Sequence, residues 1–482
     1  MTRPAGFHFL HGGALNGLLC NALQGHPLPE GVVPFACESG RVRFEAGERY
    51  NIGVTLVGEA RGLLDDLAAG LHRIGATEPD RTRPLPALCG NFEVVEVTTL
   101  PAPDLEQEAT VLAGSGGTVT LQFLAPLRME RPRAQKLPGE GYLNASFFPV
   151  PHFLLRLWGR LFRLAERRPA SEADRDALRP SLPAGAATRH PRLFWVDLPV
   201  PGEGAANGSH GGGLRLGGVM GSIGLTGISP VWVPPLVLGQ YLHAGEHVHF
   251  GLGRYRIAEL ATAGDPFRPA RSLLDRLTDP TLLRGALQHV VCHSTAAGQG
   301  GGAPERVRDL AAPLVERLAQ DLASGTYRPG ALRGRLVPED GGKVRPLAIP
   351  TVRDRAAQRA VCELLSPAID TLLEDTPFAY RKGHSRAGAA SAIRCAHDEG
   401  FRVVLDADIA SFFDAVDWDR IFIKLEALFP REPLIPLLEA WVTAPVVFGG
   451  RVIARTHGLP QGAGVSSLLA NLFLDEFEEK PP

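Results

Sequence analysis

The chain has 482 residues, of which 44% are hydrophobic and 21% charged, so it is long enough for about three folded domains. Its 50 basic and 52 acidic side chains give a formal net charge of −2, so the chain as a whole has no positive field. A surface for a polyanionic partner would therefore need a local cluster of basic side chains. The 6 cysteines form no C-x-x-C pair and no run of about 18 apolar residues occurs, so we expect a cytoplasmic protein without a zinc ribbon, a disulfide framework or a membrane partner.

The first 127 residues alternate between strand and helix patterns. Residues 6–10 predict a short strand and residues 11–23 a helix with leucines at helical spacing. Two alternating strands follow within 41–58, then a helical period over 60–75, and then two strands at 91–100 and 117–126. The order strand–helix–strand–strand–helix–strand is the signature of a ferredoxin-like unit. A second strand-rich stretch, at about 191–257, predicts another sheet.

Residues 152–168 predict an amphipathic helix with an apolar and a basic stripe. The basic stripe includes Arg156, Arg160 and Arg163. Residues 128–168 carry 9 basic against 3 acidic side chains, a local excess inside a nearly neutral chain. Such a stripe can neutralise RNA phosphates, or it can be a solvated helix face.

Residues 261–284 predict a junction, and helical patterns dominate from Arg306 onward. Residues 332–350 interrupt them with a hairpin that turns at Gly341 and Gly342. Residues 402–414 predict a buried strand that ends in carboxylates, with Asp406 and Asp408 on one side. Carboxylates at a strand end can hold Mg²⁺. Turn formation and capping of the following helix are the alternative explanation.

Four ordered motifs in this third of the chain carry a resemblance. They are G-K-V-R-P-L-A-I-P at 342–350, F-A-Y-R-K-G-H-S at 378–385, D-I-x-x-F-F-D at 408–414 and G-L-P-Q-G at 458–462. In this order and spacing they resemble reverse transcriptases of the bacterial, group II intron-like lineage. The resemblance covers roughly 285–482 and implies the fingers and part of the palm of a right-hand polymerase.

The resemblance also implies roles for individual residues. Asp408 matches the first metal-binding aspartate, which places Mg²⁺ at Asp408 and the adjoining Ile409. Phe413 matches the aromatic ring that excludes a 2′-hydroxyl and so selects deoxynucleotides. The side chains expected to contact the incoming nucleotide are Lys343, Arg345, Phe413 and Gln461, with the ammonium and guanidinium suited to a triphosphate.

One element of the resemblance is missing from the sequence. The family places an aromatic-x-Asp-Asp element after the G-L-P-Q-G motif. Only 20 residues follow Gly462, and they contain no Asp-Asp pair. We therefore expect the reverse transcriptase to be truncated inside its palm, and this chain by itself not to polymerise.

Glycine-rich elements in the first part of the chain carry a second resemblance. Residues 44–60, 217–227 and 234–257 are similar to CRISPR repeat-processing endoribonucleases of the RAMP superfamily, which consist of two ferredoxin-like folds. These enzymes cut RNA without a metal, by attack of a 2′-hydroxyl with help from a general base. His26 and His11 are the candidate bases because histidine titrates near neutrality, although each also fits an ordinary loop or helix-cap residue. Gly251 and Gly253 would let backbone amides approach RNA phosphates, although a bulge or hairpin explains them about as well.

Together the two resemblances predict an α+β chain. Residues 1–260 form tandem ferredoxin-like lobes, 261–284 a junction, and 285–482 an incomplete reverse transcriptase. The arrangement resembles type III CRISPR endoribonuclease–reverse transcriptase–integrase fusions. It implies guide-RNA maturation and spacer acquisition from RNA, with CRISPR repeat RNA, an RNA template, a DNA primer and CRISPR integrase proteins as partners. A non-catalytic RNA-binding scaffold and a group II intron maturase-like reverse transcriptase remain the alternatives.

Overall fold

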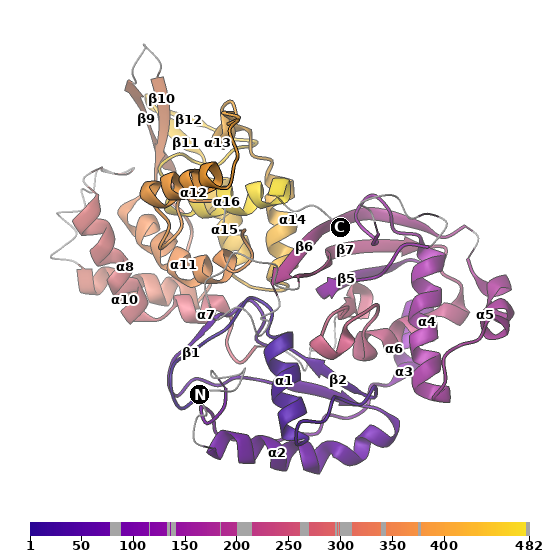
Figure 1. Ribbon diagram of the computed structural model, residues 1–482. Coiled ribbons are helices and arrows are strands. Elements are labelled where there is room, and N and C mark those ends of the chain that lie inside the picture. Colours follow the sequence, from indigo (N-terminus) through magenta and orange to yellow (C-terminus); the bar gives the residue numbers. More distant parts are fainter. Residues whose placement is uncertain are drawn as a thin grey trace. The chain divides into compact units, whose positions relative to one another are not determined.

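A computed structural model describes most of the chain, in two compact units formed by residues 1–270 and 271–478 (Figure 1). The described residues are 1–77, 88–114, 116–132, 135, 141–183, 185–199, 215–260, 269–294, 296, 298, 311–338, 344–374 and 377–478. Among them no helix combines the length and the apolar character needed to cross a membrane.

The first lobe of the N-terminal unit contains short strands and two packed helices. Its elements are β1 (Ala5–Gly6), α1 (Gly12–Ala22), β2 (Val32–Phe35), β3 (Arg43–Phe44), β4 (Gly53–Leu56) and α2 (Leu64–Ala76). β1 pairs with β3 and β2 with β4, both antiparallel. The predicted leucine spacing of α1 is confirmed, since Leu15, Leu18 and Leu19 are buried against Leu67. Gly70 permits the close helix contact, because a Cβ there would lie 2.2 Å from the Ala22 carbonyl oxygen.

One strand prediction in this lobe is wrong, and one strand of the lobe was not predicted. Residues 91–100 contain no strand, and Val95 and Val97 are 72% and 53% exposed. Their alternation matches a strand, but no described strand pairs with them, and a strand is stable only with ladder partners. Conversely, the sequence pattern does not predict β2, because four consecutive buried residues interrupted by Pro34 show no alternation.

The second lobe of this unit has the ferredoxin-like topology. Its elements are α3 (Leu105–Ala113), β5 (Val119–Leu127), α4 (Val150–Glu166), α5 (Glu172–Leu178), β6 (Ala187–Pro199), β7 (Arg215–Thr226), α6 (Val233–Leu242) and β8 (Tyr255–Ile257). The sheet order is β6-β7-β5-β8, with every pair antiparallel. Strands β5, β6, β7 and β8 with the crossing helices α4 and α6 give the order β-α-β-β-α-β. Both helices pack against the sheet through one large apolar core.

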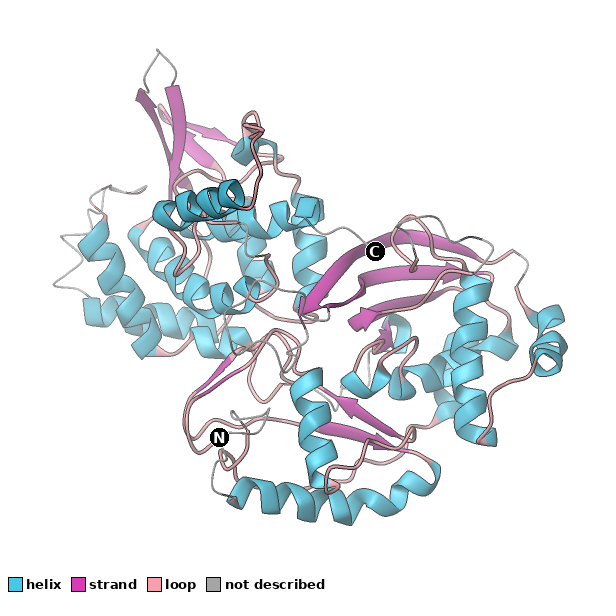
Figure 2. Ribbon diagram, viewed as in Figure 1, coloured by secondary structure: helices cyan, strands magenta, loops and turns pink. Residues whose placement is uncertain are grey.

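The C-terminal unit is mostly helical and carries one sheet (Figure 2). Its helices are α7 (Leu273–Leu277), α8 (Pro280–His293), α10 (Ala311–Ala323), α11 (Val352–Asp370), α12 (Arg386–Asp398), α13 (Phe412–Ala415), α14 (Trp418–Leu428), α15 (Ile435–Val442) and α16 (Gly464–Glu478). Its strands are β9 (Leu332–Pro338), β10 (Val344–Ile349), β11 (Val446–Phe448) and β12 (Arg451–Ile453), in the order β10-β9-β11-β12. The predicted hairpin is therefore present as β9–β10.

The long helix α11 forms the centre of this unit. Small buried residues on it, including Ala356, Ala357 and Ala360, let α8 and α16 pack closely against it. By contrast, α12 contains no buried residue. The structure thus concentrates its packing on α11 and leaves α12 exposed.

The predicted buried strand at 402–414 is wrong. Residues 401–409 have irregular backbone, and Val403 and Leu405 are 91% and 90% exposed. The apolar residues have the composition of a buried strand, but no described strand lies beside them to accept their backbone hydrogen bonds. The sequence pattern of a segment does not show whether a neighbouring strand will be present.

A fully buried ion pair joins α14 to α16. The Lys424 ammonium lies 2.7 Å from the Asp475 carboxylate, and both side chains are 1% exposed. Burying each of these ions costs several kcal/mol of desolvation, and the attraction between the two charges offsets that cost. Each charge is therefore tolerated in the core only while its partner is present.

We expect Asp475→Leu to destabilise the C-terminal unit by about 3–5 kcal/mol, because it leaves the Lys424 charge buried without its carboxylate. The double variant Lys424→Met/Asp475→Leu removes both charges and should recover most of that loss. Urea unfolding followed by tryptophan fluorescence measures both. A double variant no more stable than the single one would contradict this account.

Candidate functional site

The loop 458–462 joins the parts of the C-terminal unit that carry the predicted nucleotide-contacting residues. The Leu459 amide donates to the Phe413 carbonyl at 2.6 Å, next to α13. On the other side, the Ala348 amide of β10 donates to the Gln461 carbonyl at 2.7 Å. This loop therefore connects the region of Phe413 with the strand that also carries Arg345.

Glycine is required in this loop for a physical reason. Gly458 has a φ of +83°, and a Cβ there would lie 2.8 Å from the Asp414 carbonyl oxygen. The Gly458 carbonyl accepts hydrogen bonds from the Trp418 indole and the Arg455 guanidinium, each at 2.6 Å. The loop is thus held by backbone contact on one side and by side-chain donors on the other.

Three of the predicted nucleotide-binding residues lie around this loop. Phe413 is half-buried, and the Gln461 amide lies 3.4 Å from the Asp414 carboxylate on the same α13 turn. Arg345 is exposed on β10, three residues before Ala348. Lys343, the fourth predicted contact, lies outside the described residues.

Asp408 and Ile409 occupy the exposed irregular segment before α13. Both are exposed, and Ser411, in the left-handed conformation with φ of +49°, separates them from Phe413. Within the described part of the chain, no group of three or more His, Cys, Asp or Glu residues could hold a metal ion. The exposed donors of this segment are the Asp406 and Asp408 carboxylates and backbone carbonyls. This set fits Mg²⁺ only where water and substrate phosphates supply the other ligands.

A buried hydrogen-bond network anchors the base of the β9–β10 hairpin. The Asp354 carboxylate accepts from the Tyr327 hydroxyl at 2.5 Å, from the Thr351 hydroxyl at 2.7 Å and from the Gly330 amide at 3.0 Å. Burial, together with the neighbouring Asp354 charge, raises the pKa of Tyr327 well above its usual value, so this hydroxyl stays a donor. The network fixes the position from which the hairpin leaves the helical core.

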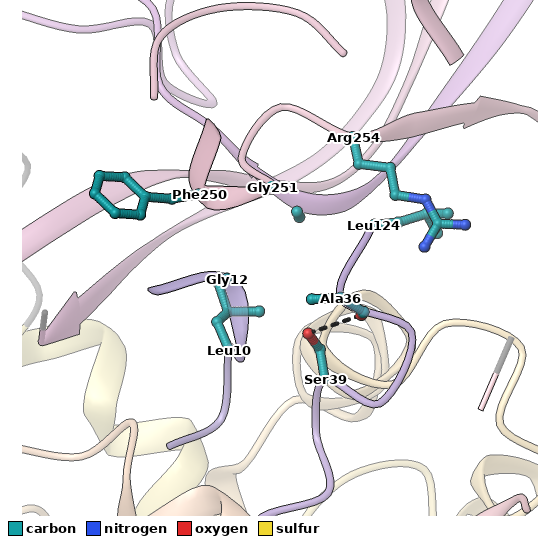
Figure 3. A pocket seen from close by; sticks show the side chains of 9 residues that line it. Leu10, Gly12, Ala36, Ser39, Leu124, Phe250, Gly251 and Arg254 are labelled. Atoms are coloured by element: carbon teal, nitrogen blue, oxygen red, sulfur yellow. Dashed lines mark hydrogen bonds between the residues drawn. The ribbon is translucent and has the colours of Figure 1, made fainter. Parts of the chain in front are cut away.

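In the N-terminal unit, a small pocket lies where α1 begins against the glycine-rich turn after η6 (Val248–Phe250). Figure 3 shows Gly12, Gly251 and Ala36 around it, with the Ser39 hydroxyl donating to the Ala36 carbonyl. A Cβ at Gly12 would lie 1.7 Å from the Phe250 carbonyl oxygen, so only glycine allows this approach. The lining residues are Leu10, Gly12, Ala36, Ser39, Leu124, Ala125, Phe250, Gly251 and Arg254.

The predicted RNA-contacting glycines use their amides inside the fold. The Gly251 amide donates to the Val248 carbonyl, and the Gly253 amide donates to the Pro126 carbonyl, each at 2.8 Å. Gly253 is also packed so tightly that a Cβ would lie 1.6 Å from the Ala244 carbonyl oxygen. Packing thus accounts for Gly253, and neither amide is free for a phosphate in this conformation.

The two candidate base histidines lie near opposite ends of α1, which is about 16 Å long. His11 is 1% exposed, stacks on Phe7, and has its Nδ1 2.9 Å from the Tyr50 hydroxyl. Burial lowers the pKa of His11 to about 3, so its ring is neutral and enclosed. His26 is exposed in the turn after α1. Of the two, only His26 presents its ring to solvent.

The predicted basic stripe on α4 is used largely within its own unit. Arg156 pairs with Glu246 and Arg163 with Glu30, each at 3.1 Å. Arg160 is 9% exposed and donates from Nε to the Leu242 carbonyl at 2.9 Å. Arg156 and Arg163 remain about half exposed, so they keep a face toward solvent.

Known sequences match part of the chain. Residues 337–481 match the family model described as reverse transcriptase (RNA-dependent DNA polymerase). The chain is 29% identical to protein YkfC of Escherichia coli strain K12 over 230 residues, covering 46% of this chain and 60% of YkfC. It is 26% identical to the group II intron-encoded protein LtrA of Lactococcus lactis subsp. cremoris over 203 residues, covering 41% of this chain and 34% of LtrA. The chain thus spans less than two thirds of the length of either relative.

Solved structures match nearly the whole chain. A structure described as a partial Cas6-RT-Cas1–Cas2 complex covers 99% of this chain with a TM-score of 0.67 and 22% identity, and the match includes 82% of that chain. A second, described as a Cas6-RT-Cas1–Cas2 complex, has the same TM-score and coverage of this chain, with 51% of that chain matched. The chain has the fold of a Cas6–reverse transcriptase fusion. The predicted α+β fold class is therefore confirmed, and the fold is that expected for the predicted fusion.

Sequence reasoning assigned no role to Arg254 of the Cas6-like unit (residues 1–270) or to Asp354 of the reverse transcriptase-like unit (residues 271–478). Arg254 lines the pocket, is 9% exposed, and places its guanidinium 4.8 Å from the centre of the Phe35 ring. An arginine directly after G-x-G was a visible signal for it. For Asp354 the signal was Thr351 three residues earlier, the spacing of a helix N-cap.

We expect the Cas6-like unit to lose stability as pH falls. The unfolded chain binds a proton on His11 near pH 6.5, whereas the folded unit resists it down to about pH 3. His11 therefore contributes full stability above pH 6.5, and about 2 kcal/mol of it is lost by pH 5. Burial also lowers the pKa of His243, which adds a loss of the same sign.

Urea unfolding at pH 7.5 and pH 5.0 measures this effect. His11→Gln, which cannot titrate, should reduce the difference between the two pH values by about 2 kcal/mol. An unchanged difference would show that His11 is not protonated on unfolding in this range.

Proposed function

We propose that the chain processes CRISPR repeat RNA with its Cas6-like unit and takes part in reverse transcription with its reverse transcriptase-like unit. The observation that carries this proposal is the match of both units, in one chain, to the structure of a Cas6-RT-Cas1–Cas2 complex. The proposed partners are repeat RNA, an RNA template, a DNA primer and the integrase proteins Cas1 and Cas2. The proposed role of the whole is guide-RNA maturation and spacer acquisition from RNA, and the proposed compartment is the cytoplasm.

RNA cleavage by the Cas6-like unit is proposed to need no metal. The 2′-hydroxyl at the cleavage site loses its proton to a general base and attacks the adjacent phosphorus. The bond to the 5′-oxygen breaks, leaving a 2′,3′-cyclic phosphate and a 5′-hydroxyl that takes up a proton. Exposure supports His26 as the base, because its imidazole lies in solvent where an RNA strand can reach it. The enclosed ring of His11 instead supports a structural role.

The reverse transcriptase-like unit is proposed to bind a deoxynucleoside triphosphate beside the loop 458–462. Arg345 would bind the triphosphate, Gln461 would contact the nucleotide and template, and the Phe413 ring would exclude a 2′-hydroxyl. Mg²⁺, held by Asp408 and the Ile409 carbonyl together with substrate phosphates, would neutralise phosphate charge. The short distances from this loop to α13 and β10 support the common location of these groups.

A non-catalytic RNA-binding scaffold is the second candidate function. The observation that favours it is that the exposed Asp408 carboxylate belongs to no group of three or more acidic, histidine or cysteine side chains that could hold a metal ion among the described residues. A group II intron maturase is less well supported, because 270 residues with the Cas6-like fold precede the polymerase unit.

Incubation with a CRISPR repeat RNA in EDTA tests the endoribonuclease. We expect cleavage at one site, leaving a 2′,3′-cyclic phosphate. His26→Ala should reduce the cleavage rate by at least about 100-fold, the usual contribution of a general base. His72→Ala on α2, also exposed, is the matched control and should cleave normally. Tight binding without cleavage would support the scaffold, and full activity of His26→Ala would remove His26 as the base.

Nucleotide binding tests the other unit, with Mg²⁺ present and a fluorescent deoxynucleotide as the probe. Arg345→Ala should weaken binding by roughly tenfold or more, the value of a hydrogen bond to a charged group. Phe413→Ala should leave deoxynucleotide binding similar but admit ribonucleotides. Arg317→Ala, exposed on α10, is the control. Unchanged discrimination in Phe413→Ala would contradict the proposed orientation of the nucleotide.

A further inference from the structure

An exposed aromatic side chain on a strained turn lies in the reverse transcriptase-like unit. Tyr380 is 70% exposed and has a φ of +57°, a conformation that non-glycine residues rarely adopt. Such a conformation costs about 1–3 kcal/mol and persists only where the surroundings enforce it. The strain keeps a large apolar ring in water, so folding alone does not account for it.

Contacts on both sides enforce this conformation. The Arg381 side chain is 5% exposed, lies 3.3 Å from the Asp370 carboxylate, and donates to the Asp370 and Pro377 carbonyls at 3.2 Å. On the other side, the Asn471 amide of α16 donates to the Ala379 carbonyl at 2.9 Å. The residues before and after Tyr380 are therefore fixed to α16 and to the end of α11. The ring is presented on a rigid base.

The chain after Tyr380 is positively charged. Lys382 and Arg386 are both exposed, and within the described residues neither forms an ion pair. Arg386 begins the 13-residue helix α12, whose N-terminal dipole adds partial positive charge. An exposed ring followed within six residues by two cations matches what single-stranded nucleic acids bind: a stacking surface for a base and positive charge for the flanking phosphates.

We propose that Tyr380 stacks on an unpaired base of a single-stranded RNA, while Lys382 and Arg386 bind the phosphates beside it. The inference rests on the proposed function, since an RNA template is the single strand that this unit would handle. It adds a binding site of sequence-independent character, because every base has a stacking face.

Binding of the full chain to a fluorescent single-stranded RNA of non-repeat sequence tests the proposal. Tyr380→Ala should weaken binding about 5- to 100-fold, whereas Tyr380→Phe, which keeps the ring, should bind as the parent does. The salt dependence should be unchanged in Tyr380→Ala and shallower in Lys382→Ala, which loses a phosphate contact. Phe401→Ala, which removes another exposed aromatic of the same unit, is the matched control.

Photo-crosslinking separates this site from the Cas6-like unit. RNA carrying 5-iodouridine should crosslink to the peptide that contains Tyr380, and an RNA with abasic nucleotides should bind the parent and Tyr380→Ala equally. Unaltered binding by Tyr380→Ala, or crosslinks only elsewhere, would overturn the proposal and favour a protein contact for the ring. Repeat-RNA cleavage and deoxynucleotide binding report on the proposed function separately, and neither depends on Tyr380.

Discussion

The hydrogen bond from the Ala348 amide to the Gln461 carbonyl is the constraint on which the C-terminal candidate site depends. It attaches the end of the β9–β10 hairpin to the loop 458–462. The loop in turn donates from the Leu459 amide to Phe413 of α13 and from the Gly458 amide to Val416 just after it. The loop 458–462 thereby links the β9–β10 hairpin to α13. The Asp354 network provides a second attachment at the same end of the hairpin, where β9 begins and β10 ends, so two sets of contacts fix the base of the hairpin.

Contacts between segments far apart in the sequence also explain how the arginines of α4 are used. The spacing of Arg156, Arg160 and Arg163 puts them on one helix face, which is the pattern of a surface for RNA. Their partners, Glu246, the Leu242 carbonyl and Glu30, come from elements far away in the sequence. Those contacts join α4 to α6 and to the first lobe, and sequence spacing cannot reveal them.

Prediction from sequence succeeded where the pattern was long and its partners were close in sequence. The leucines of α1 and the alternation of β5 both specified their buried faces. It failed at 91–100 and 402–409, where strand-like composition lacks a described strand beside it. For the site, ordered motifs were enough to select Phe413 and Gln461, which the loop places near each other. The burial of His11 depends on Phe7 and Tyr50 and was beyond any local pattern.

The exposed segment 401–409 has a consequence for the behaviour of the chain in solution. Phe401, Val403, Val404 and Leu405 form a short apolar stretch with strong β-propensity, and its backbone is open to pairing with another molecule. Arg402, Asp406 and Asp408 interrupt and flank that stretch with charge, and flanking charges of this kind oppose intermolecular β-aggregation. The Asp408 carboxylate, proposed above to bind Mg²⁺, is therefore also one of the charges that oppose such aggregation. Replacing Asp408 by a neutral residue therefore removes a proposed Mg²⁺ ligand and also weakens the protection of this segment against aggregation.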